Sequence, residues 1–361
     1  MRPVIPLKDA LKAVEAMKAC NGNQTQAARS LGMIRNTFRG WIEAAEIRYG
    51  LVWNADLPVA VEPQSEPEPP MNPLFKRPME LPAIVNGAKH TFLTNGYGRF
   101  KFGALGDTHI CSKYARLDVL EKLYDAFVAA GVTTVFHTGN WIDGEARFNV
   151  YDLTVRGMDQ QCRHLAKVYP QRPGITTYAV AGDDHEGWYA QREGVDIGAY
   201  AESKFREIGR TDWVNLGYME AAVLLKHPEG GPEAVISVVH PGGGSSYAVS
   251  YSIQKIIEGL DGGEKPAIGL YGHYHKMMFA NIRNVWTFQT ACCQDQTPFM
   301  RKKKLDAHVG GWIVNATLDK ETGAIVRCSG DAMRFFNRGY YNERWSHSGD
   351  VVQPERTLNG A

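Results

Sequence analysis

Acidic, amide and imidazole side chains follow several apolar segments of this sequence, each at the point where the segment ends. If those segments are strands of an α/β structure, their carboxyl ends meet at one edge, the usual location of ligand sites in such proteins. Carboxylate, amide and imidazole groups form the mixed oxygen and nitrogen set that suits manganese, iron or zinc. The sequence therefore predicts a metal site made of Asp107 and His109 after FGALG, Asn140 after VFHTG, Asp184 and His185 after YAVAGD, His240 at the end of VISVVH, and His273 and His275 after IGLYG.

Hydrophobic patterning indicates the elements that must position these residues. Between Phe100 and His240, the strand-like runs FKFGALG, VTTVFHTG, ITTYAVAG and EAVISVVH alternate with helical patterns. This alternation predicts an α/β layered domain with several buried strands. The later runs PAIGLYGH, MMFANI, VWTFQT, GWIVNATLD and AIVRCS are strand-rich, which predicts a second sheet packed on the first.

Turn and linker signals divide the chain. Prolines recur through residues 58–82, where they remove amide donors and favour extended conformations, so we expect a semi-stiff linker. The hairpin-type turn signals Asn86-Gly87 and Asn95-Gly96 predict that the following domain opens with a β-hairpin. The predicted organisation is a small all-α domain at 1–50, a Pro-rich linker at 51–83, a catalytic domain at 84–345 and a polar tail at 346–361.

Five motifs occur in a fixed order in the second domain: GDTH at 106–109, GN at 139–140, GDDHE at 182–186, VVH ending at 240, and GHYH at 272–275. The series resembles the calcineurin-like metallophosphoesterase superfamily, whose pattern is D-x-H, GD, GNH followed by an acidic residue, H, and GHxH. The resemblance covers the chain from about Arg99 to Arg338. It implies a four-layer αββα sandwich of two mixed sheets.

The resemblance also implies a role for each motif residue. Two divalent metal ions, manganese foremost with iron, zinc or magnesium as alternatives, would clamp a phosphoryl group, and a bridging water of lowered pKa would attack phosphorus as hydroxide. His185 would protonate the leaving group or stabilise the charge of the transition state. The implied ligands are Asp107, His109 and His275 for one ion, Asp184, His240 and His273 for the other, and Asn140 as the bridge.

Two positions depart from the family pattern. Position 140 is Asn where the family has a bridging Asp, and position 184 is Asp where the family has Asn. We hypothesise that Asp184 supplies the charge that Asn140 lacks, so that two divalent ions are still accommodated. Asp143 could instead bend in as a ligand, and Asp183 could replace Asp184 in another loop register. A member that keeps the fold and has lost catalysis through Asn140 is the remaining alternative.

The N-terminal region has helical periodicity. Apolar spacing predicts helices at 8–19, 24–31 and 35–47, with Gly32 breaking the pattern. The stretch NGNQTQAARSLGMIRNTFRGWI resembles the Fis-type helix-turn-helix. Small Ala28 allows close helix crossing, Gly32 permits the turn, and Phe38 with Trp41 anchors the third helix.

The helix-turn-helix resemblance implies that Arg35, Asn36 and Arg39 reach base edges or phosphates in the major groove. Ile34 stands where a Ser or Thr cap is common, which leaves the start of that helix open. A three-helix module used for protein contacts or dimerisation is the alternative.

Composition limits the remaining choices. The 361 residues include 40 Lys+Arg and 39 Asp+Glu, so nucleic-acid binding must come from local patches rather than a global positive field. One such patch is the basic run at 301–304, for which a solvated surface is the default and a phosphate contact the alternative. Trp188 and Tyr189 could stack on a base or pack in the core.

Six cysteines without CxxC spacing favour a reducing compartment. The absence of a signal-like N-terminus or a long apolar run predicts a cytoplasmic protein with no membrane contact.

The combined interpretation is a DNA nuclease similar in kind to the SbcD-like repair enzymes, of bacterial or phage type. Phosphodiesterase action on a non-DNA phosphoester is a second interpretation, and a DNA-binding regulator with an inactive phosphoesterase fold is a third. DNA is the expected partner. A homodimer and an ATPase partner of the SbcC kind are left open.

Overall fold

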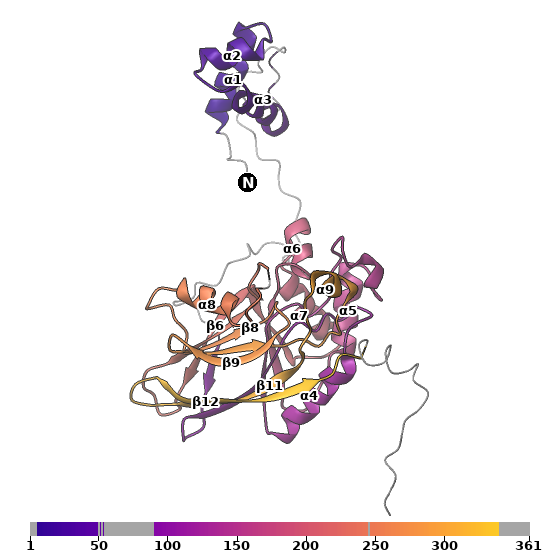
Figure 1. The fold of residues 1–361 in the computed structure, drawn as a ribbon, viewed down its shortest axis with the longest axis vertical. Coiled ribbons are helices and arrows are strands. Elements are labelled where there is room, and N and C mark those ends of the chain that lie inside the picture. The colour runs from indigo at the N-terminus through magenta and orange to yellow at the C-terminus, as the bar shows by residue number, and fades with distance from the viewer. Residues whose placement is uncertain (1–5, 50, 52, 54–89, 245, 339–361) are drawn as a thin grey trace, which may run out of the picture. The chain divides into compact units, whose positions relative to one another are not determined.

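The computed structural model describes residues 6–49, 51, 53, 90–244 and 246–338, and the chain divides into two compact units at residues 70 and 71 (Figure 1). Most of the predicted linker, the Asn86-Gly87 turn signal and the predicted polar tail lie outside the described residues. No helix in the described ranges is long and apolar enough to cross a membrane.

The N-terminal unit contains three helices: α1 (Leu7–Ala19), α2 (Gln24–Ser30) and α3 (Arg35–Tyr49). Small Ala27 and Ala28 are buried against Phe38, so the helices cross closely. The Asn23 side chain caps α2 by accepting hydrogen bonds from the backbone amides of Thr25 and Gln26, each at 3.2 Å. Gly32, with φ of +64°, makes the turn before α3. The helical expectation for this region is confirmed, and α3 extends two residues beyond the predicted 47.

The second unit contains two mixed sheets. In the first, parallel β2–β5 are extended at one edge by antiparallel β11 and β12. In the second, parallel pairs β1–β6, β7–β8 and β8–β10 are combined with antiparallel pairs β6–β7 and β9–β10. The first has the order β12 (Ile325–Phe335), β11 (Val309–Leu318), β2 (Arg99–Leu105), β3 (Thr134–His137), β4 (Thr176–Ala181), β5 (Trp213–Tyr218). The second has the order β1 (Thr91–Leu93), β6 (Glu220–Lys226), β7 (Ala234–Val239), β8 (Ile268–Tyr271), β10 (Val285–Thr290), β9 (Met277–Ile282).

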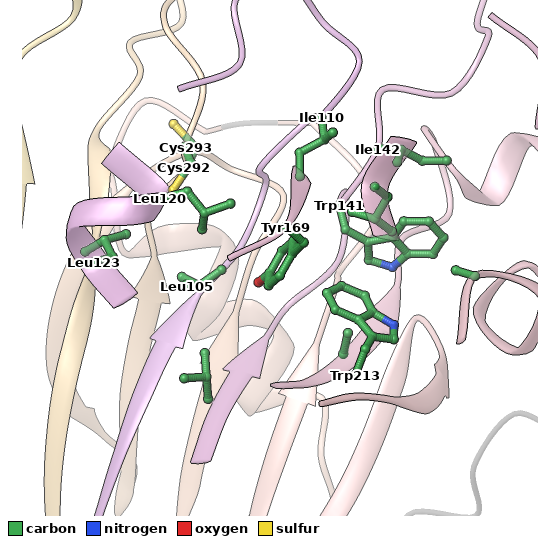
Figure 2. Close-up of a cluster of buried hydrophobic side chains, with 14 of the residues drawn as sticks. Leu105, Ile110, Leu120, Leu123, Trp141, Ile142, Tyr169, Trp213, Cys292 and Cys293 are labelled. Carbon is green, nitrogen blue, oxygen red and sulfur yellow. The ribbon is translucent and has the colours of Figure 1, made fainter. Parts of the chain in front are cut away.

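Helices cover the outer faces of both sheets, which gives the predicted αββα arrangement. The first sheet packs against α4 (Leu117–Ala129), α5 (Met158–Val168) and α7 (Ile197–Glu207), whereas α8 (Tyr251–Glu258) covers the second. Figure 2 shows Leu120 and Leu123 of α4 beside Leu105 of β2 in the helix-facing core. Between the sheets, buried side chains such as Phe136 and Ile236 form a separate core. The short helices α6 (Gly187–Glu193), α9 (Pro298–Lys303) and η2 (Val150–Asp152) lie in connecting segments.

The topology corrects the predicted hairpin at Asn95 and the predicted sheets of two groups of strands. The turn at Asn95 does not close a hairpin, because β1 pairs with β6 in the second sheet while β2 lies in the first. The Asn95 side chain instead accepts from the backbone amides of Tyr97 and Arg99, at 3.0 and 2.9 Å, and so stabilises a corner between sheets.

The division of strands between sheets also differs from chain order. The EAVISVVH run forms β7 of the second sheet, whereas the runs of β11 and β12 return to the first. Strands β5 and β6 were not predicted. The sheet assignments were wrong because hydrophobic patterning indicates that a strand is buried, but not which neighbouring strand it pairs with.

Substitution of Trp213 tests the packing of the helix-facing core. Its side chain is 2% exposed, stacks on Phe205 with ring centroids 4.9 Å apart, and meets Tyr169 edge-on at 4.8 Å (Figure 2). We predict that Trp213→Ala lowers the free energy of unfolding of the second unit by about 3–5 kcal/mol, because a large cavity replaces the packed indole ring. Urea unfolding followed by far-ultraviolet circular dichroism measures the change.

Tyr97→Ala is the matched control, because that ring is 84% exposed and its removal should change stability by less than about 0.5 kcal/mol. Equal effects of the two substitutions would contradict the assigned core.

Candidate metal centre

The predicted ligands gather where carboxyl ends of strands from both sheets meet. Strands β2, β3 and β4 lead into Asp107 with His109, Asn140 and Asp184, while β7 and β8 of the other sheet lead into the remaining three histidines. Five of these residues have left-handed backbone conformations, which non-glycine residues adopt rarely and mainly where function requires it. They are Asp107 (φ 49°), His109 (45°), Asn140 (52°), His273 (71°) and His275 (53°).

Hydrogen bonds between neighbouring loops hold this backbone in place. The Asp107 amide donates to the Gly139 carbonyl, and the His109 amide donates to the Asn140 carbonyl, both at 2.9 Å. Across the two sheets, the His273 amide donates to Asp107 Oδ2 at 2.9 Å. The loops after β2, β3 and β8 are therefore joined into one framework before any ligand is considered.

The first candidate group consists of Asp107, His109 and His275. Asp107 Oδ1 lies 3.4 Å from His275 Nε2 and 3.9 Å from His109 Nε2, and the two imidazole nitrogens face each other at 3.1 Å. One potential ligand atom from each residue lies within 4.8 Å of the others. The three atoms can surround a single cation.

The second candidate group consists of Asp184, His240 and His273, with Asp183 beside it. Asp184 Oδ1 lies 3.4 Å from His240 Nε2, and Asp184 Oδ2 lies 3.5 Å from His273 Nδ1. Asp184 thus faces both histidines, as expected from its place before His185. Asp183 remains close enough to contribute an oxygen.

Asn140 lies beside the second group, where glycine keeps the space open. A Cβ atom at Gly182 would lie 2.2 Å from Asn140 Oδ1 and 3.1 Å from His240 Nε2. Any side chain at this position would clash with both polar atoms. The glycine is required because two potential ligand atoms converge on its backbone.

Three of the histidines use one ring nitrogen for an anchor and direct the other at the site. His240 Nδ1 donates to the Thr138 carbonyl at 2.7 Å, His109 Nδ1 to Asp143 Oδ1 at 2.9 Å, and His273 Nε2 to the Gly243 carbonyl at 2.6 Å. We assign these tautomers from the acceptors. Each leaves the inward nitrogen with a lone pair for a metal ion, the usual arrangement of metal-binding histidines.

Buried polar atoms without hydrogen bonds mark the centre of the site. Burial of such atoms costs free energy unless a partner is supplied, and a cation satisfies carboxylate, amide and imidazole lone pairs together. The donor set therefore fits a pair of divalent ions. Among the described residues of the site, the atoms concerned are Asp107 Oδ1, Asn140 Oδ1, Asp183 Oδ1, Asp184 Oδ1, Glu186 Oε2, His240 Nε2, His273 Nδ1 and His275 Nδ1.

The pKa shifts of Asp107 and His240 also indicate that the site favours positive charge. Burial opposes ionisation of Asp107, yet the surrounding imidazoles, His275 foremost, lower its pKa to about 2. Burial likewise opposes protonation of His240, but Asp184 and Asp107 raise its pKa to about 9. These two carboxylates therefore favour positive charge at His240 and would likewise favour a bound cation, whereas burial lowers the pKa of His109 to about 4.

His185 is positioned by Asp143. Its Nδ1 lies 2.8 Å from the Asp143 backbone oxygen and 3.3 Å from Asp143 Oδ1, while Nε2 lies 4.0 Å from Asp184 Oδ2. Despite burial, Asp184 and Asp143 raise the pKa of His185 to about 10. The Asp143 carboxylate, an alternative ligand by sequence, accepts from His109 Nδ1 at 2.9 Å and forms, with His109 and His185, a third group whose potential ligand atoms lie within 4.8 Å of one another.

Glu186, which lies in the GDDHE motif but was given no role from the sequence, is a positioning residue. Its Oε1 accepts hydrogen bonds from the backbone amides of Gly182 and Asn140, at 2.7 and 2.8 Å, and therefore ties the loops after β3 and β4 together. Burial raises the pKa of Glu186 to about 7. In the sequence, its position at the end of the GDDHE motif is the feature that could have indicated this role.

A cavity of about 500 Å³ opens beside these residues. Its lining includes His109, Asn140, Asp184, His185, His273 and His275, together with side chains of α9 and of the loop after β3. Both candidate groups therefore border a single cavity that a ligand could occupy. Tyr189, which by sequence could stack on a base or pack in the core, is 1% exposed and packs in the helix-facing core.

The predicted DNA-contacting residues lie at the N-terminal end of α3. Arg35, Asn36 and Arg39 are all exposed, and Arg39 forms an exposed ion pair with Glu43 at 3.7 Å. Ile34, directly before the helix, is 76% exposed, and its carbonyl accepts from the Phe38 amide at 3.0 Å. The exposed face of α3 is available for contact with another molecule.

Fold and site together define an α/β sandwich with a candidate two-cation centre at the joined ends of its sheets. Residues 14–40 match the family model of the bacterial regulatory proteins of the Fis family. No curated protein matches the chain in sequence.

Several solved structures are similar to the chain at low sequence identity. An archaeal phosphodiesterase is 15% identical over 65% of this chain and 100% of that one, with a TM-score of 0.34. Zinc-complexed Vps29 from Entamoeba histolytica is 12% identical over 66% and 100%, with a TM-score of 0.30. A predicted phosphoesterase from Streptococcus pneumoniae is 14% identical over 65% and 98%, with a TM-score of 0.27.

Metal titration tests the hypothesis that Asp184 supplies the charge that Asn140 lacks. We predict that Asp184→Asn weakens binding of one manganese ion by at least about tenfold, because the site loses a charge that faces two histidines. The double variant Asn140→Asp/Asp184→Asn should restore two ions per chain, since it returns the missing charge. Isothermal titration and elemental analysis of the metal-free full chain measure both.

Asp183→Asn is the matched control and should keep two ions. If it loses an ion while Asp184→Asn does not, the ligand assignment is wrong; if the native chain binds only one ion, the two-cation centre is wrong.

Proposed function

We propose that this chain is a two-metal phosphodiesterase that cleaves DNA, with its Fis-type module supplying affinity for the substrate. The observation that carries the proposal is the set of buried, unbonded carboxylate, amide and imidazole atoms beside a cavity, with protonatable His185 at its wall. Such a set fits two divalent cations and one proton donor, the requirement for in-line displacement at phosphorus.

The proposed ligands are Asp107, His109 and His275 on one side, Asp184, His240 and His273 on the other, and Asn140 between them. When bound, the ions, which we take to be manganese, would supply Lewis-acid charge and a water of lowered pKa. The chain supplies the positioning: anchored histidines keep fixed lone pairs, and Glu186 holds two of the ligand-bearing loops together.

His185 is the proposed proton donor to the leaving oxygen. Its Nδ1 is occupied by the Asp143 carbonyl, so Nε2 is the nitrogen left to face the cavity. Neighbouring carboxylates raise its pKa, which keeps it protonated at neutral pH and able to give a proton to an alkoxide as the phosphodiester bond breaks. The same positive charge stabilises negative charge on the phosphoryl oxygens.

DNA is the proposed substrate because the Fis-family match and the exposed Arg35, Asn36 and Arg39 lie in the same chain as the catalytic unit. Tethering raises the local concentration of DNA at the cavity without any new contact there. The proposal is of the SbcD-like kind, in which phosphodiester cleavage serves repair, recombination or phage DNA metabolism.

One observation favours a second candidate function. Asn140 places a neutral amide at the proposed bridging position, which reduces the attraction for a second ion unless Asp184 compensates. Without that compensation, the chain would be a DNA-binding regulator that carries an inactive phosphoesterase fold.

Cleavage assays separate these functions. We predict that the purified full chain with manganese cleaves DNA and that His185→Ala lowers kcat by about 10²- to 10⁴-fold, the usual contribution of a general acid. Single-stranded DNA, duplex DNA and bis(4-nitrophenyl) phosphate are compared under identical conditions. The nitrophenyl ester should be least affected by His185→Ala, because its acidic leaving group needs little protonation.

His164→Ala is a matched control, since that imidazole lies on α5 outside the cavity lining. Hydrolysis of the ester without cleavage of DNA would instead indicate a non-DNA phosphoesterase. Absence of any turnover would support the regulator.

The helix-turn-helix role makes a separate prediction. The double variant Arg35→Ala/Arg39→Ala should weaken binding of duplex DNA. It should also reduce the slope of log affinity against log salt by about one for each phosphate that the substituted side chains would neutralise. Hydrolysis of the nitrophenyl ester should be unchanged. Fluorescence anisotropy at several salt concentrations measures the slope.

Lys12→Ala, which removes an exposed positive charge on α1, is the control for net charge. An equal effect of Lys12→Ala would show that α3 has no special part in DNA binding.

A further inference from the structure

Two half-exposed phenylalanine rings line the cavity beside the candidate metal centre. Phe148 lies in the loop after β3 and Phe299 lies in α9, and their side chains are 48% and 38% exposed. The rings stack on each other with centroids 4.8 Å apart and an interplanar angle of 27°. We call this pair the aromatic ledge. Its exposed faces keep apolar surface in contact with water, which is unfavourable until a ligand covers them.

The aromatic ledge adjoins the proposed proton donor. The Phe148 ring meets the His185 ring edge-on, with centroids 5.7 Å apart and an interplanar angle of 89°. A planar group stacked on the ledge would therefore lie next to the leaving oxygen that His185 protonates. Met300 and Leu305 also line the cavity.

A cation lies on the same helix as Phe299. Lys303 lines the cavity, whereas Arg301, Lys302 and Lys304 of the basic run do not. No carboxylate in the described part of the chain forms an ion pair with Lys303. Its charge is thus available to a ligand. An apolar planar surface with a cation beside it is the combination that binds single-stranded nucleic acid.

We propose that the aromatic ledge stacks the base of an unpaired nucleotide next to the scissile phosphate, with Lys303 contacting a neighbouring phosphate. The inference rests on the proposed function and names its substrate class as single-stranded DNA or the frayed end of a duplex. Bases inside a duplex are covered on both faces by their neighbours, so only an unstacked base can lie on a protein ring.

Binding to the metal-free full chain tests the ledge without any turnover. The probe is a five-nucleotide DNA carrying one 2-aminopurine, whose fluorescence is quenched when it stacks. The native chain should quench it, and Phe148→Ala and Phe299→Ala should each weaken binding by roughly tenfold, the reduction expected for one stacked base. Phe299→Trp should keep the quenching, because it keeps an aromatic face. Tyr151→Ala, which removes a 92% exposed ring outside the cavity lining, should bind as the native chain does.

Cleavage of abasic substrates provides a second test. A series of oligonucleotides carries one abasic residue at successive positions, and KM is measured with manganese for the native chain and for Phe148→Ala/Phe299→Ala. For the native chain, one position should raise KM by roughly tenfold, and the double variant should no longer distinguish that position. Additive effects of the abasic residue and the double variant would overturn the ledge.

The phosphate contact of Lys303 is tested with one variant and one matched control. Lys303→Met should lower the magnitude of the slope of log affinity against log salt for the five-nucleotide probe by about 0.7, the value for one phosphate contact on a single strand. Lys302→Met, its neighbour outside the cavity lining, should leave that slope unchanged. Equal slopes for the two variants would overturn the phosphate contact.

These outcomes separate the inference from the proposed function. If DNA is cleaved but the aromatic variants and Tyr151→Ala behave alike, the ledge is wrong and the nuclease stands. If no phosphoester is cleaved but the native chain quenches the probe and the aromatic variants do not, the nuclease is wrong and the ledge remains a binding site for an unpaired base. Quenching that survives both alanine substitutions overturns the ledge whatever the cleavage result.

Discussion

The arrangement of the second unit depends on the need to neutralise buried polar atoms where two sheets meet. Asp107 is fully buried, and Oδ1 of the partly exposed Asp184 is buried without a hydrogen bond, so their charges would be costly without compensation. The imidazoles after β7 and β8 of the opposite sheet provide that compensation. The polar groups at this edge therefore link two sheets that are also joined by an apolar core and by hydrogen bonds such as that from Trp312 Nε1 to the Gln289 carbonyl at 2.8 Å. A pair of divalent ions would replace proton-carried charge at the same position.

Backbone conformation is the means by which so many polar groups fit into one small volume. Strands end at Leu105, His137 and Tyr271, and the chain then turns abruptly through left-handed residues rather than continuing outward. Each such turn brings a side chain back across the strand end. Absence of a Cβ at Gly182 and Gly139 leaves space for Asn140 and His240 to approach. The strain is tolerated because hydrogen bonds between the loops overdetermine the backbone.

Much of this centre could be predicted from the sequence because each ligand follows its strand by only a few residues. The strand's apolar run and the following Asp, Asn or His are local features, so Asp107, Asn140 and His240 could be placed at strand ends without knowing the fold. Which sheet each strand joins is not local, and the predicted hairpin at Asn95 and the division of strands by chain order were wrong for that reason. The roles of Asp143 and Glu186 also depend on orientation: one anchors imidazoles and the other bridges two loops, although both appear in sequence as further acids near the site.

Under the proposed function, substrate specificity would arise from parts of the chain other than the candidate metal centre. The ligand-bearing turns are short and mutually hydrogen-bonded, so they have little freedom to change shape without displacing a ligand. Other parts of the cavity lining come from α9 and from a later part of the loop after β3, where side chains such as Phe148 and Lys303 are exposed. These segments can vary in size and chemistry while the strand ends stay as they are. Under the proposed function, affinity and chemistry are also separate: exposed cations on α3 would select a DNA partner without constraining the geometry at phosphorus, because the two units have separate cores.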